Sequence, residues 1–270
     1  MAHAALQDGG FSDIQYSVFR RKVKGLIGID LEDYRSGQLM RRLQAIMARA
    51  GAADLIAYGR MLEQDAQQLK EFSDYLTINV SEFFRDPDRF AYLKDKVLPE
   101  LIAGRRRLNV WSAGCANGAE PYTLAILLEE LSPGGAHRVL ATDIDDRSLL
   151  KARLGADYRE QDVRNVPISL LKKYFIRQDS RYEVVHSIRR RPIFKKHNLL
   201  SDPFEEGFDL ILCRNVVIYF TVEAKDRVFQ GFSSSLKPGG VLFVGATEVI
   251  QNCGRISLEA VRPSFYRRIG

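Results

Sequence analysis

From about residue 108 onward, this 270-residue chain alternates short apolar segments with helical ones, and few folds accommodate that pattern. The apolar segments have the length and the bounding turns of strands, and the segments between them repeat apolar residues at helical spacing. The predicted strands are 108–111, 139–144, 208–213 and 241–244, and the predicted helices are 120–131, 147–154 and 222–236. This order is typical of a doubly wound sheet with helices on both faces, so we predict an α/β fold.

Residues 1–76 show no strand pattern; their apolar residues recur at helical spacing, and Gly51 is the expected C-cap of one helix. We therefore predict a small all-helical domain over 1–76, a linker over 77–107 and the α/β domain over 108–270. Within the last domain, residues 181–196 interrupt the alternation with two short strand-like runs. We interpret this interruption as an inserted antiparallel β-hairpin.

Charge is unevenly distributed along the chain. The net charge is +6, from 40 Lys and Arg against 34 Asp and Glu, and two segments are strongly basic. The first lies between Asp33 and Asp54 and contains Arg35, Arg41, Arg42 and Arg49, and the second, 181–197, contains Arg189, Arg190 and Arg191. Concentrated basic surfaces favour an acidic partner.

The composition also argues against several classes of protein. No apolar run is long enough to span a membrane, and the first residues lack the pattern of a signal peptide. We therefore expect a cytoplasmic protein without direct membrane insertion. The three cysteines form neither a metal-ligand pattern nor a disulfide framework, and the four histidines show no ligand spacing, so we expect no metal.

Two carboxylates beside a glycine-containing turn indicate a cofactor site. Gly114 and Gly118 have a G-x-x-x-G spacing, which matches neither a dinucleotide fingerprint nor a P-loop. Asp143 ends the second strand, where an acid can accept both ribose hydroxyls, and Glu120 begins the helix after the turn. Two acids repel a pyrophosphate and suit a cationic ligand, so S-adenosylmethionine fits better than NAD. A plain tight turn, and a Glu120 that only stabilises its helix dipole, remain open readings.

Six motifs, taken together and in order, resemble the chemotaxis receptor methyltransferases of the CheR type, which methylate glutamates on chemoreceptor signalling helices. The motifs are TINVSEFFR (77–85), WSA (111–113), EPYT (120–123), ATDID (141–145), NLL (198–200) and CRNVVIYF (213–220). The resemblance extends from about residue 11 to residue 268. It implies a helical N-terminal domain, a class I methyltransferase domain with a Rossmann-like sheet, and an inserted β subdomain.

The resemblance also implies roles for individual residues. The cofactor-binding residues would be Asn79, Ser81, Arg85, Gly114, Glu120, Asp143, Asn198, Leu199, Arg214 and Asn215. Arg85 and Tyr219 would be catalytic and would orient the substrate carboxylate, which is ionised at neutral pH and needs no general base. Two positions depart from the family pattern: Ser81 stands where Thr is common, and Ala119 stands where an acid is common.

In this family the partner is an acidic receptor bundle. We expect the bundle to contact Arg35, Arg41, Arg42 and Arg49, with the apolar residues of the same helix packed inward. The hairpin residues Arg189, Arg190 and Arg191 would contact it as well. A family hairpin can also bind a C-terminal receptor pentapeptide, but the approach 174–184 here has no glycine, so we predict that no tether is used. We expect a monomer.

Four other functions are weighed against this prediction. A nucleic-acid methyltransferase would explain the basic segments, but the chain has no Pro-Pro motif of the amino-methylating enzymes and no Pro-Cys nucleophile, so no nucleic-acid partner is expected. A dehydrogenase would need the missing phosphate fingerprint. A small-substrate class I methyltransferase, or a silent adaptor that only binds receptors, stays open, although an adaptor has no reason to retain Glu120, Asp143, Arg85 and Tyr219.

Overall fold

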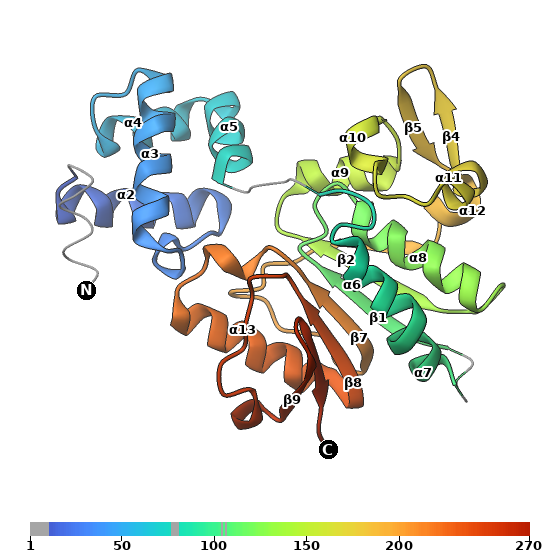
Figure 1. Ribbon diagram of the computed structural model, residues 1–270. Helices are drawn as coiled ribbons and strands as arrows, with labels where there is room; N and C mark the ends of the chain where they lie inside the picture. The colour runs from blue at the N-terminus through green and yellow to red at the C-terminus, as the bar shows by residue number, and fades with distance from the viewer. Residues whose placement is uncertain (1–10, 77–80, 104, 106) are drawn as a thin grey trace. The chain divides into compact units, whose positions relative to one another are not determined.

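The computed structural model describes residues 11–76, 81–103, 105 and 107–270, and the chain divides into two units (Figure 1). The first unit contains the described residues up to 76 together with 219–226. The second contains the described residues of 79–218 and 227–270. None of the helices in the described part of the chain is both long and apolar enough to cross a membrane.

The first unit is helical, as predicted. Its helices are α2 (Asp13–Ile27), α3 (Ser36–Ala50), α4 (Leu55–Gln64) and α5 (Ala66–Leu76), with the short 3-10 turn η1 (Leu31–Asp33) between the first two. A capping box between Ser12 and Gln15 begins α2, and Gly51 ends α3 with a φ of 67°, which confirms its predicted C-cap role. The rings of Phe19, Tyr58 and Phe72 pack together inside this unit at centroid distances of 5.9–6.0 Å.

The second unit is built on a seven-stranded sheet in the order β6-β2-β1-β7-β8-β10-β9. The strands are β1 (Asn109–Ala113), β2 (Arg138–Asp143), β6 (Pro192–Lys196), β7 (Phe208–Cys213), β8 (Leu236–Val244), β9 (Leu258–Arg262) and β10 (Phe265–Arg268). The first five of these pair in parallel, whereas β10 is antiparallel to both β8 and β9. The α/β fold predicted from the alternation is therefore confirmed.

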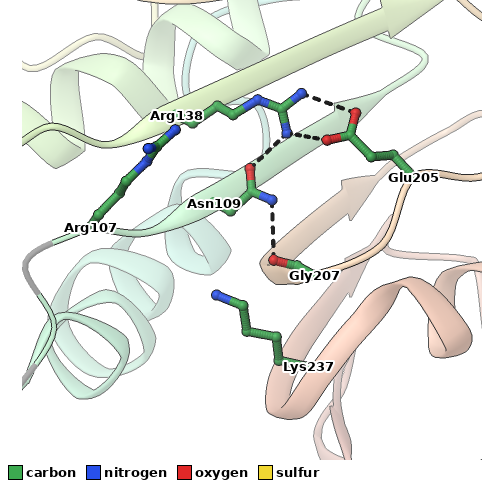
Figure 2. Close-up of a pocket in the computed structure, with 6 residues that line it drawn as sticks. All are labelled: Arg107, Asn109, Arg138, Glu205, Gly207 and Lys237. Atoms are coloured by element: carbon green, nitrogen blue, oxygen red, sulfur yellow. Dashed lines mark hydrogen bonds and ion pairs between the residues drawn. The ribbon is translucent and has the colours of Figure 1, made fainter.

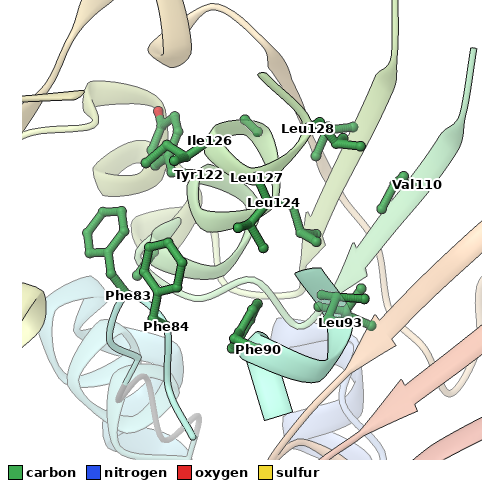
Figure 3. Packing of buried hydrophobic residues seen from close by; sticks show 14 of the residues in the cluster. Phe83, Phe84, Phe90, Leu93, Val110, Tyr122, Leu124, Ile126, Leu127 and Leu128 are labelled. Atoms are coloured by element: carbon green, nitrogen blue, oxygen red, sulfur yellow. The ribbon is translucent and has the colours of Figure 1, made fainter. Parts of the chain in front are cut away.

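Helices cover both faces of this sheet. They are α6 (Pro87–Tyr92), the π-helical turn η2 (Leu93–Val97), α7 (Leu98–Ile102), α8 (Ala119–Leu131), α9 (Asp146–Leu154) and α13 (Val222–Ser235). On one face, Val110 belongs to the same buried cluster as Leu124 of α8 and Phe90 of α6 (Figure 3). Successive strand residues point to opposite faces, and the next residue, Trp111, lies 5.3 Å from Phe232 of α13 between ring centroids.

The predicted antiparallel β insertion is confirmed, but it is not the hairpin that was predicted over 181–196. A separate antiparallel sheet, in the order β3-β5-β4, combines β3 (Tyr158–Arg159), β4 (Phe175–Gln178) and β5 (Arg181–Val184), and Figure 1 shows β4 and β5 as a hairpin. The short helices around it are α10 (Glu160–Val163), α11 (Ile168–Tyr174) and α12 (His186–Arg189). The second run, β6, instead pairs in parallel with β2 at the edge of the main sheet. Alternation of apolar and polar residues indicates a strand, but it does not determine which other strand it pairs with.

Candidate functional site

The strand order of the main sheet reverses between β1 and β7, and ligands of such sheets bind at the carboxyl ends of the strands there. The turn after β1 holds its backbone close to its neighbours. A side chain at Gly114, where φ is 80°, would place its Cβ 2.4 Å from Cγ2 of Val216. Gly118, with a φ of 88°, is bounded by Ala152 in the same way, at 3.0 Å. Both positions need glycine for φ and for space.

Asp143, at the end of β2, holds this turn and still has acceptor capacity. Its side chain is 7% exposed, and Ala116 N donates to Oδ2 at 2.8 Å while Asp145 N donates to Oδ1 at 3.0 Å. Burial raises the pKa of Asp143, and the backbone donors oppose that rise. A carboxylate offers about four lone-pair sites, and the backbone N–H groups of Ala116, Asp145 and Ile144 point at this one, so at least one site is left for a ligand hydroxyl.

Glu120, in the first turn of α8, is a second buried carboxylate. Ser112 Oγ donates to its Oε1 at 2.7 Å, and Arg214 Nη1 donates to its Oε2 at 3.3 Å. Burial raises the pKa of Glu120, whereas the charges of Arg214 and Arg85 lower it. Because the nearby guanidinium favours the ionised form, Glu120 can present negative charge to a cationic ligand.

Arg214 connects that carboxylate to the segment before α6. Its buried guanidinium donates to Arg85 O at 2.8 Å and to Asp86 Oδ2 at 2.6 Å, and it lies over the rings of Phe90 and Phe243 at 5.0 and 4.7 Å. The two rings also contact each other edge-on, at 5.7 Å between centroids, so both pack against the same cation. Arg214 thus ties Arg85, from the predicted linker, to the sheet edge.

A second contact ties the same segment to the glycine turn. Asn117 Nδ2 donates to Ser81 O at 3.2 Å, and Asn117 Oδ1 accepts from Ala119 N at 3.1 Å. Asn117 was not among the predicted site residues, although its place between Gly114 and Gly118 could have suggested it. Asn79 lies outside the described residues.

The other predicted cofactor residues lie in two loops of the second unit. Asn198 begins a turn after β6, in which its Oδ1 accepts from Leu200 N at 3.0 Å and its backbone N donates to Asp202 at 2.9 Å. Leu199, in the same turn, lines a surface cavity of about 280 Å³. Asn215 follows β7 with a φ of 59°, and its buried Oδ1 has no hydrogen-bond partner among the described residues.

Tyr219 belongs to the first unit, where η1 and the residues after it hold its backbone. Arg35 N donates to Tyr219 O at 2.9 Å, and Arg35 Nε donates to Phe220 O at 3.3 Å. Tyr34 packs edge-on against Phe220 at 5.5 Å between ring centroids. The side chain of Arg35 therefore contacts the Tyr219 segment within the protein, a contact that the sequence analysis did not anticipate.

The other basic residues of α3 differ in exposure. Leu39, Leu43 and Ile46 are buried, as predicted. Arg41 and Arg49 are exposed, whereas the guanidinium of Arg42 lies 4.6 Å from the ring of Tyr75. Two side chains of α3, Arg41 and Arg49, therefore present their charge to solvent.

The three arginines near α12 are also unequal. Arg189 pairs with Glu183 of β5, and Arg191 pairs with Glu129 of α8 at 2.7 Å. Arg190 is exposed. Because Arg189 and Arg191 already have carboxylate partners, Arg190 is the one of the three with the most solvent access.

A further cavity, of about 350 Å³, lies at the amino ends of the strands (Figure 2). It is lined by Arg107, Asn109, Arg138, Glu205, Gly207 and Lys237. Arg138 pairs with Glu205 at 2.6 Å, and Lys237 pairs at 3.0 Å with the fully buried Asp209. These pairs offset much of the positive charge, and the cavity lies at the opposite ends of the strands from Asp143 and Glu120.

The sheet order and the two acids at its carboxyl edge are the features of S-adenosylmethionine-dependent methyltransferases. The residues fit this cofactor, because Asp143 keeps free acceptor sites, Glu120 is a buried acid beside them, and Asn215 has an unpartnered oxygen. Comparison with known proteins gives the same class. Residues 79–262 match the family described as "CheR methyltransferase, SAM binding domain", and residues 14–77 match "CheR methyltransferase, all-alpha domain".

The chain belongs to the CheR methyltransferase family, and its cofactor is S-adenosylmethionine. It is 38% identical over 252 residues to a chemotaxis protein methyltransferase of Listeria innocua, covering 93% of this chain and 96% of the relative. It is 34% identical to the chemotaxis protein methyltransferase of Borreliella burgdorferi, covering 89% of each chain. The Escherichia coli chemotaxis protein methyltransferase is 33% identical, with coverage of 90% and 85%.

Proposed function

We propose that the protein methylates the γ-carboxylate of specific glutamates on the cytoplasmic helices of chemoreceptors, giving glutamyl methyl esters and S-adenosylhomocysteine for sensory adaptation. The observation that carries the proposal is the pair of buried acids, Asp143 and Glu120, at the carboxyl edge of the sheet. The names of the relatives support the chemotactic setting. When bound, S-adenosylmethionine supplies an electrophilic methyl group.

In this proposal the two acids divide the cofactor between them. Asp143 binds the ribose through the acceptor capacity that Ala116, Asp145 and Ile144 leave open. Glu120, whose ionised form the neighbouring Arg214 favours, attracts the methionyl ammonium. The remaining contacts to the cofactor come from the turn at Gly114, from Asn79, Ser81 and Arg85, from Asn198 and Leu199 at the adenine, and from Arg214 and Asn215 at the methionyl part.

The protein's task toward the substrate is orientation. A glutamate is already ionised at neutral pH, so its carboxylate must be desolvated and aimed at the methyl carbon, and no proton has to be removed. Arg85 binds one carboxylate oxygen through charge-assisted hydrogen bonds, and the Tyr219 hydroxyl donates to the other. These two residues are therefore the proposed catalytic pair.

Substrate recognition is assigned to basic residues that solvent reaches. Arg41 and Arg49 of α3, with Arg190 beside α12, are exposed and can meet an acidic bundle. Arg42, whose guanidinium lies against Tyr75, is partly exposed and contributes to receptor binding less directly. Contacts within the protein hold Arg35, Arg189 and Arg191. We propose that the enzyme acts as a monomer in the cytoplasm, at membrane receptor arrays.

The prediction that no receptor pentapeptide is needed assumes that a segment without glycine avoids positive φ. The structure contradicts this assumption, because Asp179 in the β4–β5 turn has a φ of 51°. Asp and Asn tolerate this region better than other side chains. The tether therefore has to be tested directly.

Mass spectrometry tests the main proposal. A purified receptor signalling fragment is incubated with the enzyme and methyl-deuterated S-adenosylmethionine, then digested and sequenced. We expect label on glutamate side chains, removed by mild base, as esters are. The Asp143→Asn enzyme is the matched control and should label far more slowly. Label on lysine or on added nucleic acid, with none on glutamate, would contradict the proposal.

A further inference from the structure

Glu248 is a buried carboxylate that binds backbone and was not among the predicted site residues. It lies after β8 and is 5% exposed. Asn215 N and Gly245 N donate to its Oε2 at 2.9 and 2.6 Å, and Val216 N and Ile218 N donate to its Oε1 at 3.0 and 3.3 Å. Three of these four donors belong to the loop that follows β7.

This carboxylate is held by backbone dipoles. In the described part of the chain, no Lys, Arg or His side chain forms an ion pair with Glu248. Burial raises its pKa, and the four backbone donors oppose that rise because they favour the ionised form. An anion that binds consecutive backbone N–H groups fixes the conformation of the segment that presents them.

The loop turns at a left-handed residue and leaves little room for side chains. Asn215 has a φ of 59°, in the left-handed region that Asn adopts more readily than most side chains. A Cβ at Gly245 would lie 2.5 Å from Glu248 Oε2 and 3.0 Å from Asn215 N, so only glycine lets the two loops approach. Asn215 also carries the buried, unpartnered Oδ1 at the proposed cofactor site.

We propose that Glu248 is a positioning residue for methyl transfer: its carboxylate fixes the backbone of residues 215–218 and thereby orients Asn215 toward the cofactor. Through Ile218 N, the same carboxylate also holds the backbone that directly precedes Tyr219 in the chain. The part of this inference that concerns Tyr219 rests on the proposed function, whereas the part that concerns Asn215 depends on the cofactor alone.

The first test compares Glu248→Gln with Glu248→Asp. The glutamine keeps the size but turns an NH₂ group toward two of the backbone donors, and the aspartate keeps the charge but is one methylene shorter. The matched control is Glu259→Gln, an exposed glutamate of β9. We expect Glu248→Gln to weaken S-adenosylhomocysteine binding in calorimetry about tenfold or more, Glu248→Asp to weaken it less, and the control to bind like the unchanged protein.

The second test asks whether the effect passes through the loop. In hydrogen–deuterium exchange, peptides covering 214–219 should lose protection in Glu248→Gln, while peptides from β1 and α8 keep theirs. The loss of affinity should also shrink in an Asn215→Ala background, because residues that act as a unit are not additive. Equal affinity losses in both backgrounds, or unchanged protection of 214–219, would overturn the proposal.

A third measurement separates positioning from folding. At saturating cofactor, and at a temperature where circular dichroism shows both proteins folded, Glu248→Gln should still give a slower single-turnover methylation of the receptor fragment. A variant that has lost only thermal stability, with affinity and rate restored on cooling, would refute a positioning role. If the unchanged enzyme does not methylate receptors, the proposed function fails, whereas the binding and exchange tests still judge Glu248.

Discussion

Replacing Asp143 by asparagine tests the centre of the site with the smallest change in shape. The carboxylate accepts backbone N–H groups from Ala116 at 2.8 Å and from Asp145 at 3.0 Å, and the N–H of Ile144 also points at it, so at least one of its roughly four lone-pair sites is left for a ribose hydroxyl. In Asp143→Asn, the NH₂ group that replaces one carboxylate oxygen can accept neither the backbone N–H nor the ribose hydroxyl, whichever way the amide is turned. The variant therefore loses at least one charge-assisted hydrogen bond to the ribose.

A hydrogen bond to a charged group contributes about 1.5–3 kcal/mol, so the affinity for S-adenosylhomocysteine should fall by about 10- to 150-fold. Asp143→Asn also loses one backbone hydrogen bond within the turn, and this loss should lower the thermal stability of the cofactor-free protein. Calorimetry measures the first effect and thermal unfolding the second. Asp146→Asn is the control, because Asp146 is exposed and pairs with the exposed Lys196. If Asp143→Asn binds like the unchanged protein, the assignment of the ribose to Asp143 is refuted.

Four more predictions follow from the site and its surroundings. Tyr219→Phe should slow single-turnover methylation about tenfold, the equivalent of one hydrogen bond, with S-adenosylhomocysteine affinity unchanged; an equal rate would remove the hydroxyl from the mechanism. Charge reversal at Arg41 and Arg49 should slow receptor association at low salt and have a smaller effect at high salt. The control Arg60→Glu, on α4, should not slow association, and a defect of the same size at both salt concentrations would contradict electrostatic docking. Because burial raises the pKa of Asp143 and the ribose needs its ionised form, cofactor affinity should fall as the pH is lowered through that raised pKa, and a flat calorimetric profile would contradict this. The same raised pKa means that the native state binds more protons than the unfolded chain between the ordinary and the raised value, so the contribution of this group to stability falls as the pH rises through that window. Finally, a tether-type receptor pentapeptide should show no micromolar binding in calorimetry, and clear binding would establish a docking edge.

The elements with a local signature could be predicted from the sequence. The buried strand 208–213 follows from a short, nearly continuous apolar run, and the helix that starts near Glu120 follows from a longer apolar run with Pro121 in its first turn. Asp143 and the glycine turn could also be assigned as a site from the sequence, because the carboxyl ends of neighbouring parallel strands meet at one edge of the sheet. Such arguments need only the order of the elements.

Pairing between distant residues could not be predicted in this way. The run 192–196 has the alternation of apolar and polar residues expected of a hairpin strand, yet it pairs with β2. Such alternation shows which face of a strand is buried, but it does not determine which strand lies beside it. Arg214 binds Glu120, 94 positions away in the chain, and Arg191 binds Glu129, 62 positions away. Only the folded structure therefore decides whether such a basic residue contacts a ligand or pairs with a carboxylate of the protein. The loop at Asn215 depends on Glu248 in the same way, since a buried carboxylate finds its backbone donors only after the sheet has brought β7 and β8 side by side.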